Sequence, residues 1–414
     1  MRMKFNKSSQ LLLVSAASLL AAGLVTACGT LTVDFVFVAS SKAAGPNNYG
    51  QINVFEINQE SGFMRQIPTS PFPSGGRNPV AEAVSADHSN LYVVNEDDNT
   101  IVQFVIGNDG KVYPQNTTNT PGIYPMAAAV NGTNLFVVDT YQPLPICSNA
   151  APCSGSVAVF PITVGAGTNP SDPLGSPVAN GSLTYWPLNL PSKPSDIIVP
   201  TAINVLASGS AVYITAYDTT VTPRAGYVFA FAVGSGGGLT PLNGGAPYPA
   251  GTQPSAIASD SSSSYVYVTD FANGDVLGYS VASGVLTPLA GSPFAAGNQP
   301  SAIVADPAYP FVYVANSLDA TVQAYSMSSG VLTSLGTYST GTQPVAIGID
   351  PSTNHFVYTA NYLGNGVSGT VSGFELSPTA GTLLNSQNSP YQSNALPTAV
   401  VAIPHGSAKS SSSK

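Results

Sequence analysis

The sequence predicts an all-β fold, a seven-bladed propeller of four-stranded antiparallel blades closed by pairing of its N-terminal strands with its C-terminal strand. Three observations predict it. Short apolar runs alternate with polar residues, 40 glycines and 35 prolines supply turns, and no sustained helical period follows the N-terminal segment. A strand-like motif recurs seven times, at spacings of 44 to 77 residues, which is typical of propeller blades. The two ends of the chain also carry complementary parts of one repeat.

Each repeat is expected to open with an inner strand that follows a proline. These strands consist mainly of small residues, which suits strands that crowd around one axis. Their copies are NPVAEAV, YPMAAAV, KPSDIIV, QPSAIAS, QPSAIVA, QPVAIGI and LPTAVVA. The second strand is apolar and ends in a small or polar residue. Its copies are FVFVAS, LYVVN, LFVVD, VYITA, VYVTD, VYVAN and VYTAN.

The third strand carries an aromatic residue at the same register in every repeat. The seven are Phe55, Phe104, Phe160, Phe231, Tyr279, Tyr325 and Phe374. Ligand stacking is one explanation, but adjacent blades must bury their faces against each other, so we assign these aromatics to the core. A glycine turn then leads to an outer strand, where proline is tolerated because one backbone edge stays unpaired.

The two ends of the chain are expected to complete one blade. The last inner strand, 397–403, has no strands after it, and the first repeat, near Val33, has no inner strand before it. Their pairing would remove the open edges of the ring. The longest spacing then marks an insertion within one blade, around Cys147 and Cys153.

Residues 1–27 predict a lipoprotein signal peptide. A basic start precedes an apolar run over 11–25, which is shorter than the roughly 20 residues of a membrane span. The run ends in Val-Thr-Ala-Cys-Gly, which resembles a bacterial lipobox with Cys28 as the lipidated residue. An ordinary signal peptide with a chance cysteine is the alternative, and the spacing favours the lipobox.

The mature protein is then expected to have three parts. A short anchored linker, 28–33, precedes a propeller over 34–404 and a Ser-rich tail, 405–414, that is too polar to pack. Position 29 is Gly rather than the Asp often found in inner-membrane lipoproteins, so the outer membrane or cell surface is the favoured location.

Export would make the chain more acidic. The formal net charge of −9 becomes −12 without the basic residues of the signal peptide, which are Arg2, Lys4 and Lys7. Such a chain offers no basic surface for nucleic acid. We expect a monomer that contacts the membrane through Cys28, with no nucleic-acid partner and no cofactor.

Cys147 and Cys153 close a short loop, Cys-Ser-Asn-Ala-Ala-Pro-Cys. In an oxidising compartment two such cysteines predict a disulfide. A metal pair is the alternative, but no histidine lies nearby in the sequence to complete a ligand set. We therefore expect a structural disulfide.

The pattern Leu-Thr-Pro-Leu-x-Gly-Ser-Pro-Phe, followed by Gln-Pro-Ser-Ala-Ile and Val-Tyr-Val-Ala-Asn, resembles the lactonase family of seven-bladed propellers. That family includes 6-phosphogluconolactonase-like members and is close to the propellers named for YVTN repeats. The resemblance covers residues 34–404 and implies the fold, with hydrolysis of a cyclic ester as the associated activity. It also implies His, Glu and Arg at the channel mouth, whereas His88 and His355 are expected on the opposite face and His405 in the tail.

Loops at the channel mouth are the expected place for a site, because function concentrates on loops held by a rigid scaffold. The loops that lead into the inner strands carry Arg77, Asn78, Lys193, Gln253, Gln299 and Gln343. Those after the second strands carry Glu96, Asp97, Asp98, Asp139, Tyr141, Asp218, Arg224, Asp270, Asp319 and Tyr362. The alternative is that such residues only solvate turns and cap strand ends.

Two carboxylates break the pattern of the inner strands. Glu82 replaces an apolar residue at the third position after the proline, and Asp196 replaces Ala at the second. A buried carboxylate is costly unless it is paired or protonated, so both are candidate site residues. Arg77 at the mouth is a possible partner for Glu82, as a catalytic or as a structural ion pair.

Three functions remain open on the sequence. The first is an envelope-exposed propeller that binds a protein or polysaccharide through its loop face. The second is a lactone hydrolase that uses Glu82 with Arg77 or Arg224 and a bound metal or water. The third is a structural envelope component without a specific ligand. No haem, metal or nucleophile motif adds another class.

Overall fold

A computed structural model describes residues 32–41, 48–58, 61–143, 147, 152–163, 174–350, 355–363, 368–393 and 395–404. The expected signal peptide, the lipidation site Cys28 and the tail lie outside these residues. No helix in the described part of the chain is long and apolar enough to cross a membrane.

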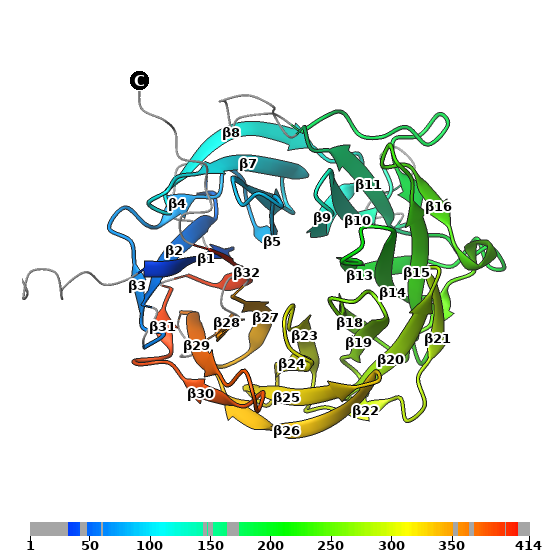
Figure 1. Ribbon diagram of the computed structural model, residues 1–414. Helices are drawn as coiled ribbons and strands as arrows, with labels where there is room; N and C mark the ends of the chain where they lie inside the picture. The colour runs from blue at the N-terminus through cyan, green and yellow to red at the C-terminus, as the bar shows by residue number, and fades with distance from the viewer. Residues whose placement is uncertain are drawn as a thin grey trace, which may run out of the picture.

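Seven antiparallel sheets surround a central axis, as the sequence predicts (Figure 1). Blade 1 joins both chain ends through β32 (Pro397–Pro404), β1 (Thr32–Ser40), β2 (Gln51–Asn58), β3 (Met64–Gln66) and β4 (Phe72–Pro73). Blade 2 consists of β5 (Pro79–Val84), β6 (Asn90–Asn95), β7 (Thr100–Ile106) and β8 (Val112–Asn119). Blade 3 consists of β9 (Ile123–Val130), β10 (Asn134–Tyr141), β11 (Ser156–Pro161) and β12 (Trp186–Pro187).

The other four blades repeat the same order from the axis outward. Blade 4 holds β13 (Ile198–Val205), β14 (Ala211–Asp218), β15 (Ala225–Val233), β16 (Leu239–Pro241) and β17 (Tyr248–Pro249), with a 3-10 turn at Asn243–Gly245. Blade 5 holds β18 (Pro254–Ser259), β19 (Tyr265–Asp270), β20 (Asp275–Ala282), β21 (Val285–Pro288) and β22 (Phe294–Ala295). Blade 6 holds β23 (Pro300–Ala305), β24 (Phe311–Asn316), β25 (Thr321–Ser328) and β26 (Val331–Ser339). Blade 7 holds β27 (Pro344–Ile349), β28 (Phe356–Asn361), β29 (Thr370–Leu376), β30 (Leu383–Asn385) and β31 (Tyr391–Gln392).

The predicted closure is confirmed in blade 1. Strand β1 pairs antiparallel with β32, from Asp34 opposite Pro404 to Ser40 opposite Pro397. On its other side β1 pairs with β2. The first and last strands of the propeller therefore share one sheet, in which β32 is the innermost strand and covers the edge of β1.

The core consists of the seams between neighbouring blades. Seven clusters of buried apolar residues each combine side chains from two adjacent blades. The third-strand aromatics at the shared register, such as Phe104 and Phe374, are almost fully buried in these clusters. Their assignment to the core is confirmed.

Hydroxyl groups also tie neighbouring inner strands together. Ser255 donates to the carbonyl of Pro300 at 2.6 Å, and Ser301 donates to that of Pro344 at 2.7 Å. Thr398 of β32 donates to the carbonyl of Pro79 at 2.7 Å. The last inner strand thus meets the next blade in the same way as inner strands elsewhere in the ring.

The long insertion lies in blade 3, between β10 and β13 of the next blade. Cys147 and Cys153 form a disulfide with their Cα atoms 5.5 Å apart, as expected. Trp186, the single tryptophan, lies in the short outer strand β12 and is buried against the seam with blade 4.

Candidate functional site

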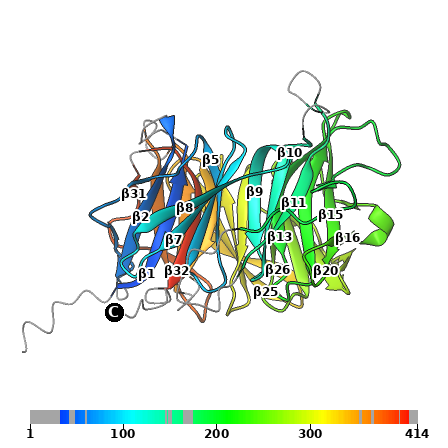
Figure 2. The ribbon, with the colours of Figure 1, turned by 90° about the horizontal axis from the view of Figure 1, so that it is seen from above.

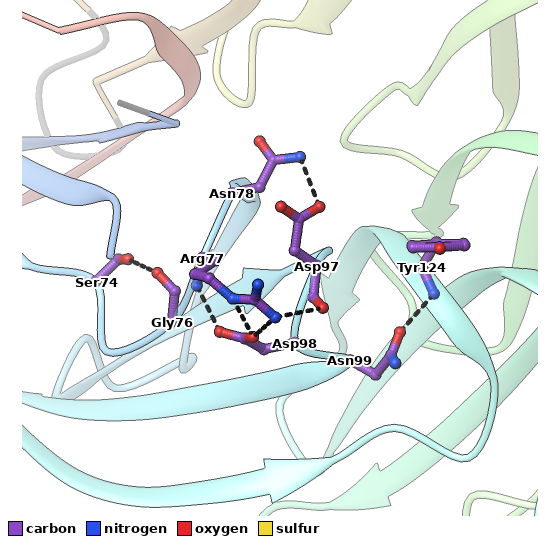
Figure 3. Close-up of polar contacts among 8 residues, drawn as sticks. All are labelled: Ser74, Gly76, Arg77, Asn78, Asp97, Asp98, Asn99 and Tyr124. Carbon is purple, nitrogen blue, oxygen red and sulfur yellow. Dashed lines mark hydrogen bonds and ion pairs between the residues drawn. The ribbon is translucent and has the colours of Figure 1, made fainter. Parts of the chain in front are cut away.

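The mouth is the face on which each chain segment leads into an inner strand and each second strand ends. Figure 2 shows the ring from the side, with the strands running between its two faces. Arg77, Asn78 and Asp97 lie together at the mouth side of blade 2 (Figure 3). His88 lies in the turn between β5 and β6, which is on the opposite face, as predicted.

One residue per blade lines the start of the inner strand and is fixed by a recurring bond; we call this set the mouth ring. It consists of Leu396, Asn78, Tyr124, Ile197, Gln253, Gln299 and Gln343. In six blades the backbone carbonyl of this residue accepts the amide of the residue that follows the second strand, at 2.8–3.0 Å. In blade 3 the carbonyl of Tyr124 accepts the Thr140 hydroxyl at 2.8 Å.

Four mouth-ring residues have a left-handed backbone. Their φ values are 52° at Asn78, 57° at Tyr124, 54° at Gln299 and 58° at Gln343. This region is unfavourable for residues with a Cβ, and for Tyr more than for Asn. Such conformations persist where the surrounding structure holds them and often accompany function.

The glutamines of the mouth ring keep their side-chain amides available. Gln253, Gln299 and Gln343 occupy consecutive blades and are partly buried. None of the three side chains makes a hydrogen bond to another described residue, whereas Asn78 donates to Glu96 at 2.6 Å. The arc from blade 5 to blade 7 therefore presents three adjacent neutral amides.

Each second strand carries a fully buried polar residue at or near its mouth end. These residues are Ser40, Asn95, Asp139, Asp218, Asp270, Asn316 and Asn361. They include three of the candidate mouth carboxylates, and each of those accepts a backbone amide at 2.6–3.1 Å: Asp139 from Gly122, Asp218 from Thr220, and Asp270 from Thr252, Gln253 and Ala272. The carboxylates therefore cap loops, which is the alternative role that the sequence leaves open for them.

Burial raises the pKa of one of these caps, Asp139, and of a neighbouring carboxyl, Asp275. It raises the pKa of Asp139 to about 7, although the Thr120 hydroxyl and the Gly122 amide oppose the shift. Burial and the neighbouring Asp270 raise the pKa of Asp275 to about 6. Both groups are carboxylates in surroundings that disfavour negative charge.

Arg77 forms its hydrogen bonds with the neighbouring mouth loop, between β6 and β7 (Figure 3). Its backbone amide and its Nε donate to Asp98 at 2.7 and 2.6 Å, and the guanidinium also donates to the carbonyl of Asp97. Burial alone would raise the pKa of Asp98, but the hydrogen bonds and charge of Arg77 outweigh it and lower that pKa. For the nearby Glu96, burial and then Asp97 raise the pKa.

Glu82 does not pair with Arg77. It stands opposite Val93 on β6 and so faces the seam between blades 1 and 2. Both carboxyl oxygens are buried and make no hydrogen bond within the described residues. Burial raises the pKa of Glu82 to about 8, with the backbone of Ala39 opposing the shift, so this carboxyl is mostly protonated at neutral pH.

Asp196 does not occupy the position that the sequence predicts. The inner strand of blade 4 begins at Ile198, so Asp196 lies in the preceding loop, 3.7 Å from Lys193. The proline expected to open this strand precedes the actual strand by several residues. The inner-strand residue at the register of Glu82 is therefore Ile203.

The basic side chains are dispersed. Four of the five in the described chain pair with carboxylates: Arg65 with Glu56, Arg77 with Asp98, Lys111 with Asp109 and Lys193 with Asp196. The fifth, Arg224, lies over the ring of Tyr217 at 4.6 Å. Arg224 is in blade 4 and Arg77 in blade 2, and no described contact joins either residue to Glu82. No phosphate clamp is assembled among these residues.

Two mouth tyrosines add an apolar surface beside the ring. Tyr124 and Tyr141 pack edge to face with their centroids 6.2 Å apart, and both are partly exposed. Tyr141 is a candidate on the sequence, but Tyr124, Ile197 and Leu396 are not. The residue before the strand-opening proline is the signal that identifies Tyr124 and Leu396.

A cavity of about 300 Å³ lies on the opposite face, between blades 4 and 5. It is lined by aliphatic residues and by Ser208, Ser210, Ser263 and Ser283. No candidate site residue lines it. Within the described residues, no three His, Cys, Asp or Glu side chains gather as metal ligands.

The described residues form a seven-bladed β-propeller. The family described as Lactonase, 7-bladed beta-propeller, matches residues 277–397, which confirms the resemblance seen in the sequence. No curated protein sequence matches the chain.

Solved structures share the fold at low sequence identity. A candidate 6-phosphogluconolactonase from Bacteroides fragilis is 20% identical, with a TM-score of 0.67 over 90% of this chain and 99% of the other. A candidate 6-phosphogluconolactonase from Bacteroides uniformis is 17% identical, with a TM-score of 0.67 over the same shares. The periplasmic gluconolactonase PpgL of Pseudomonas aeruginosa is 18% identical, with a TM-score of 0.66 over 90% and 99%.

Proposed function

We propose that this chain is an exported, lipid-anchored propeller that binds a neutral polysaccharide at its mouth ring. The observation that carries the proposal is the row of unbonded amides at Gln253, Gln299 and Gln343. A primary amide offers two donors and one acceptor on a planar group, which complements the paired hydroxyls of a sugar. Partly buried, loop-fixed amides lose little freedom on binding.

The charge of the mouth supports a neutral ligand. Its buried carboxylates, Asp139, Asp218 and Asp270, are occupied as loop caps, and Arg77 is held by Asp98. Among the described residues, no cluster of free basic side chains is left at the mouth to select a phosphate. Tyr124 and Tyr141 supply an amphipathic surface beside the amides, which suits the apolar face of a sugar ring.

Polysaccharide binding can be tested by depletion of the soluble Cys28→Ala protein on insoluble cellulose, chitin and xylan. Binding to at least one of them is expected. Combined replacement of Gln253, Gln299 and Gln343 by Leu should weaken that binding at least tenfold, because the buried sugar hydroxyls would lose their partners.

The control is Gln115→Leu, an exposed glutamine on the outer strand β8, which should leave binding unchanged. Absence of binding to every polymer, or equal binding by the triple variant, would contradict the proposal.

Export and anchoring at Cys28 are part of this proposal. They are supported by the lipobox resemblance and by the Cys147–Cys153 disulfide, which suits an oxidising compartment. Mass spectrometry of the N-terminal peptide from membrane fractions should detect acyl groups on Cys28.

Hydrolysis of an unphosphorylated sugar lactone is the second candidate. Its support is the family match and the likeness to a protein named as a periplasmic gluconolactonase. Water would add to the ester carbonyl and the ring C–O bond would break, giving the hydroxy acid. Such a substrate does not require a phosphate clamp.

Proton release from glucono-δ-lactone measures this activity directly. If the protein is a hydrolase that uses the sequence candidates, Glu82→Gln, Arg77→Ala and Arg224→Ala should each lower the rate at least tenfold. The buried carboxyl of Glu82 and the separate blades of the two arginines favour the opposite result, a rate no higher than that of the buffer.

A further inference from the structure

We propose that the face opposite the mouth lies against the lipid surface, so that the mouth ring points away from the membrane. This inference rests on the lipid anchor at Cys28 that is part of the proposed function. It concerns which surface of the propeller the membrane occupies, and it follows from the direction of β1.

The chain enters the ring at the face opposite the mouth. At one end of β1, Ser40 pairs with Pro397, and the next amide, that of Ser41, donates to the mouth-ring carbonyl of Leu396 at 3.0 Å. At the other end Asp34 pairs with Pro404. Because a strand crosses the blade from face to face (Figure 2), Asp34 marks the opposite face.

The length of the tether holds that face near the membrane. Cys28 precedes the first residue of β1, Thr32, by four residues, which span at most about 14 Å when fully extended. The strand from Asp34 to Ser40 is itself about 20 Å long at about 3.3 Å per residue. To bring the mouth to the membrane, the tether would have to run the whole height of the blade, which is more than its extended length.

Charge favours the same orientation. At the mouth rim Asp97 and Asp319 are exposed carboxylates, and an anionic lipid surface would repel them. Near the opposite face the partly exposed Lys111 is neutralised by Asp109, and the side chains of Asp260 and Asp306 are buried in turns. Glu375, near the opposite-face end of β29, is also an exposed carboxylate, so the advantage in charge is small and the length of the tether carries the orientation.

Lipid-nitroxide quenching tests the orientation. In blade 7, next to the anchored blade, Thr342 is exposed in the mouth loop and Ala380 is exposed in the turn between β29 and β30 on the opposite face. Thr342→Cys and Ala380→Cys each provide one free thiol for a bimane label, since Cys147 and Cys153 are joined. The lipidated proteins are reconstituted into phosphatidylcholine vesicles that contain a headgroup-nitroxide lipid.

Quenching of the label at Ala380→Cys is expected to exceed that at Thr342→Cys several-fold. The same labels on unlipidated Cys28→Ala protein should show no quenching at either position. Equal quenching, or stronger quenching at Thr342→Cys, in protein that carries the lipid would overturn the orientation alone. Absence of acyl groups on Cys28 by mass spectrometry would overturn the anchor, and the orientation with it, while leaving polysaccharide binding to be judged by its own assay.

Discussion

Tyrosine hydroxyls show how a single group ties neighbouring blades. Three second-strand tyrosines donate to the glycine carbonyl in the outer turn of the next blade: Tyr213 to Gly284 at 2.9 Å, Tyr267 to Gly330 at 2.8 Å and Tyr313 to Gly381 at 3.1 Å. Tyr92 and Tyr358 stand at the same register, but their buried hydroxyls have no partner among the described residues. The repeat thus contains both a bonded and an unbonded version of one side chain.

Removal of a bonded hydroxyl should therefore lower the free energy of unfolding, whereas removal of an unbonded one should not. Tyr267→Phe is expected to lower the free energy of unfolding by about 1 kcal/mol, because the carbonyl of Gly330 loses its donor. Tyr92→Phe should leave stability unchanged or raise it, since an unsatisfied buried hydroxyl disappears. Urea denaturation of both variants measures this difference, and equal losses would contradict the assignment.

Glu82 predicts a pH dependence of stability. Its folded pKa of about 8 lies above the ordinary value of 4.5, so the folded state binds more protons than the unfolded state between these values. Stability from this group is therefore complete below pH 4.5 and is lost as the pH rises through 8. At pH 9 Glu82→Gln should be more stable than the native protein by on the order of 4 kcal/mol, because each tenfold difference in proton affinity between the two states corresponds to about 1.4 kcal/mol.

Thermal unfolding at pH 5 and pH 9 measures this effect. The two proteins should differ little at the lower pH. Glu375→Gln, which changes an exposed carboxylate of β29, serves as the control and should show no such dependence. A constant difference between native and Glu82→Gln protein across the range would show that Glu82 is not titrating in the seam.

At the scale of the element, the mouth loops depend on the polar ends of the second strands. Asp270 accepts the amides of Thr252, Gln253 and Ala272 and is fully buried. Asp270→Ala should lower the free energy of unfolding by about 3 kcal/mol, because several amides lose a charged acceptor. Hydrogen exchange at 251–253 should accelerate as the loop loosens.

Asp319→Ala is the matched control for this loop cap. Asp319 is exposed and bonds only the amide and side chain of Asn298 in the described chain. Asp319→Ala should lower the free energy of unfolding by well under half as much as Asp270→Ala does. Similar effects of the two substitutions would show that burial does not set the strength of the cap.

The sequence predicts the blades well because the same kinds of residue recur at the same positions in the repeats. An aromatic such as Phe104 must be buried between blades, and five of the inner strands begin with a proline, so these elements can be recognised in the sequence. Blade 4 is where this reasoning fails. Its second strand continues to Asp218 and its inner strand begins at Ile198, so the early proline misplaces Asp196.

The candidate site is harder to predict, because the same residue types serve as caps and as ligand contacts. In the sequence, three carboxylates resemble site residues: Asp139, Asp218 and Asp270. Their burial and their hydrogen bonds to the backbone depend on the tertiary structure and cannot be seen in the sequence. The pattern of the inner strands correctly marks Glu82 as an exception, but it does not give the partner, since Arg77 finds Asp98 across the loop. Spacing along the chain does not reveal which of two nearby carboxylates an arginine reaches.

At the scale of the whole molecule, ring closure depends on one strand. β32 contributes Ala402 and Val400 to the seam with blade 7, and Ile403 and Val401 to the seam with blade 2. A chain that ends at Leu396 would lose contacts at two seams and expose the edge of β1, which is an aggregation hazard. We expect this truncation to be insoluble, or to lack a cooperative thermal transition by circular dichroism.

Truncation after Pro404 removes only the tail and should leave the melting temperature unchanged. A synthetic peptide with the sequence of 397–404, added during refolding of the Leu396 truncation, should restore soluble protein, because it supplies the missing inner strand to β1. Restoration should fail with a peptide in which Val401 is replaced by Asp, since that side chain faces the seam with blade 2. A Leu396 truncation that folds with the native melting temperature would mean that the seams alone hold the ring, without the strand that joins its two ends.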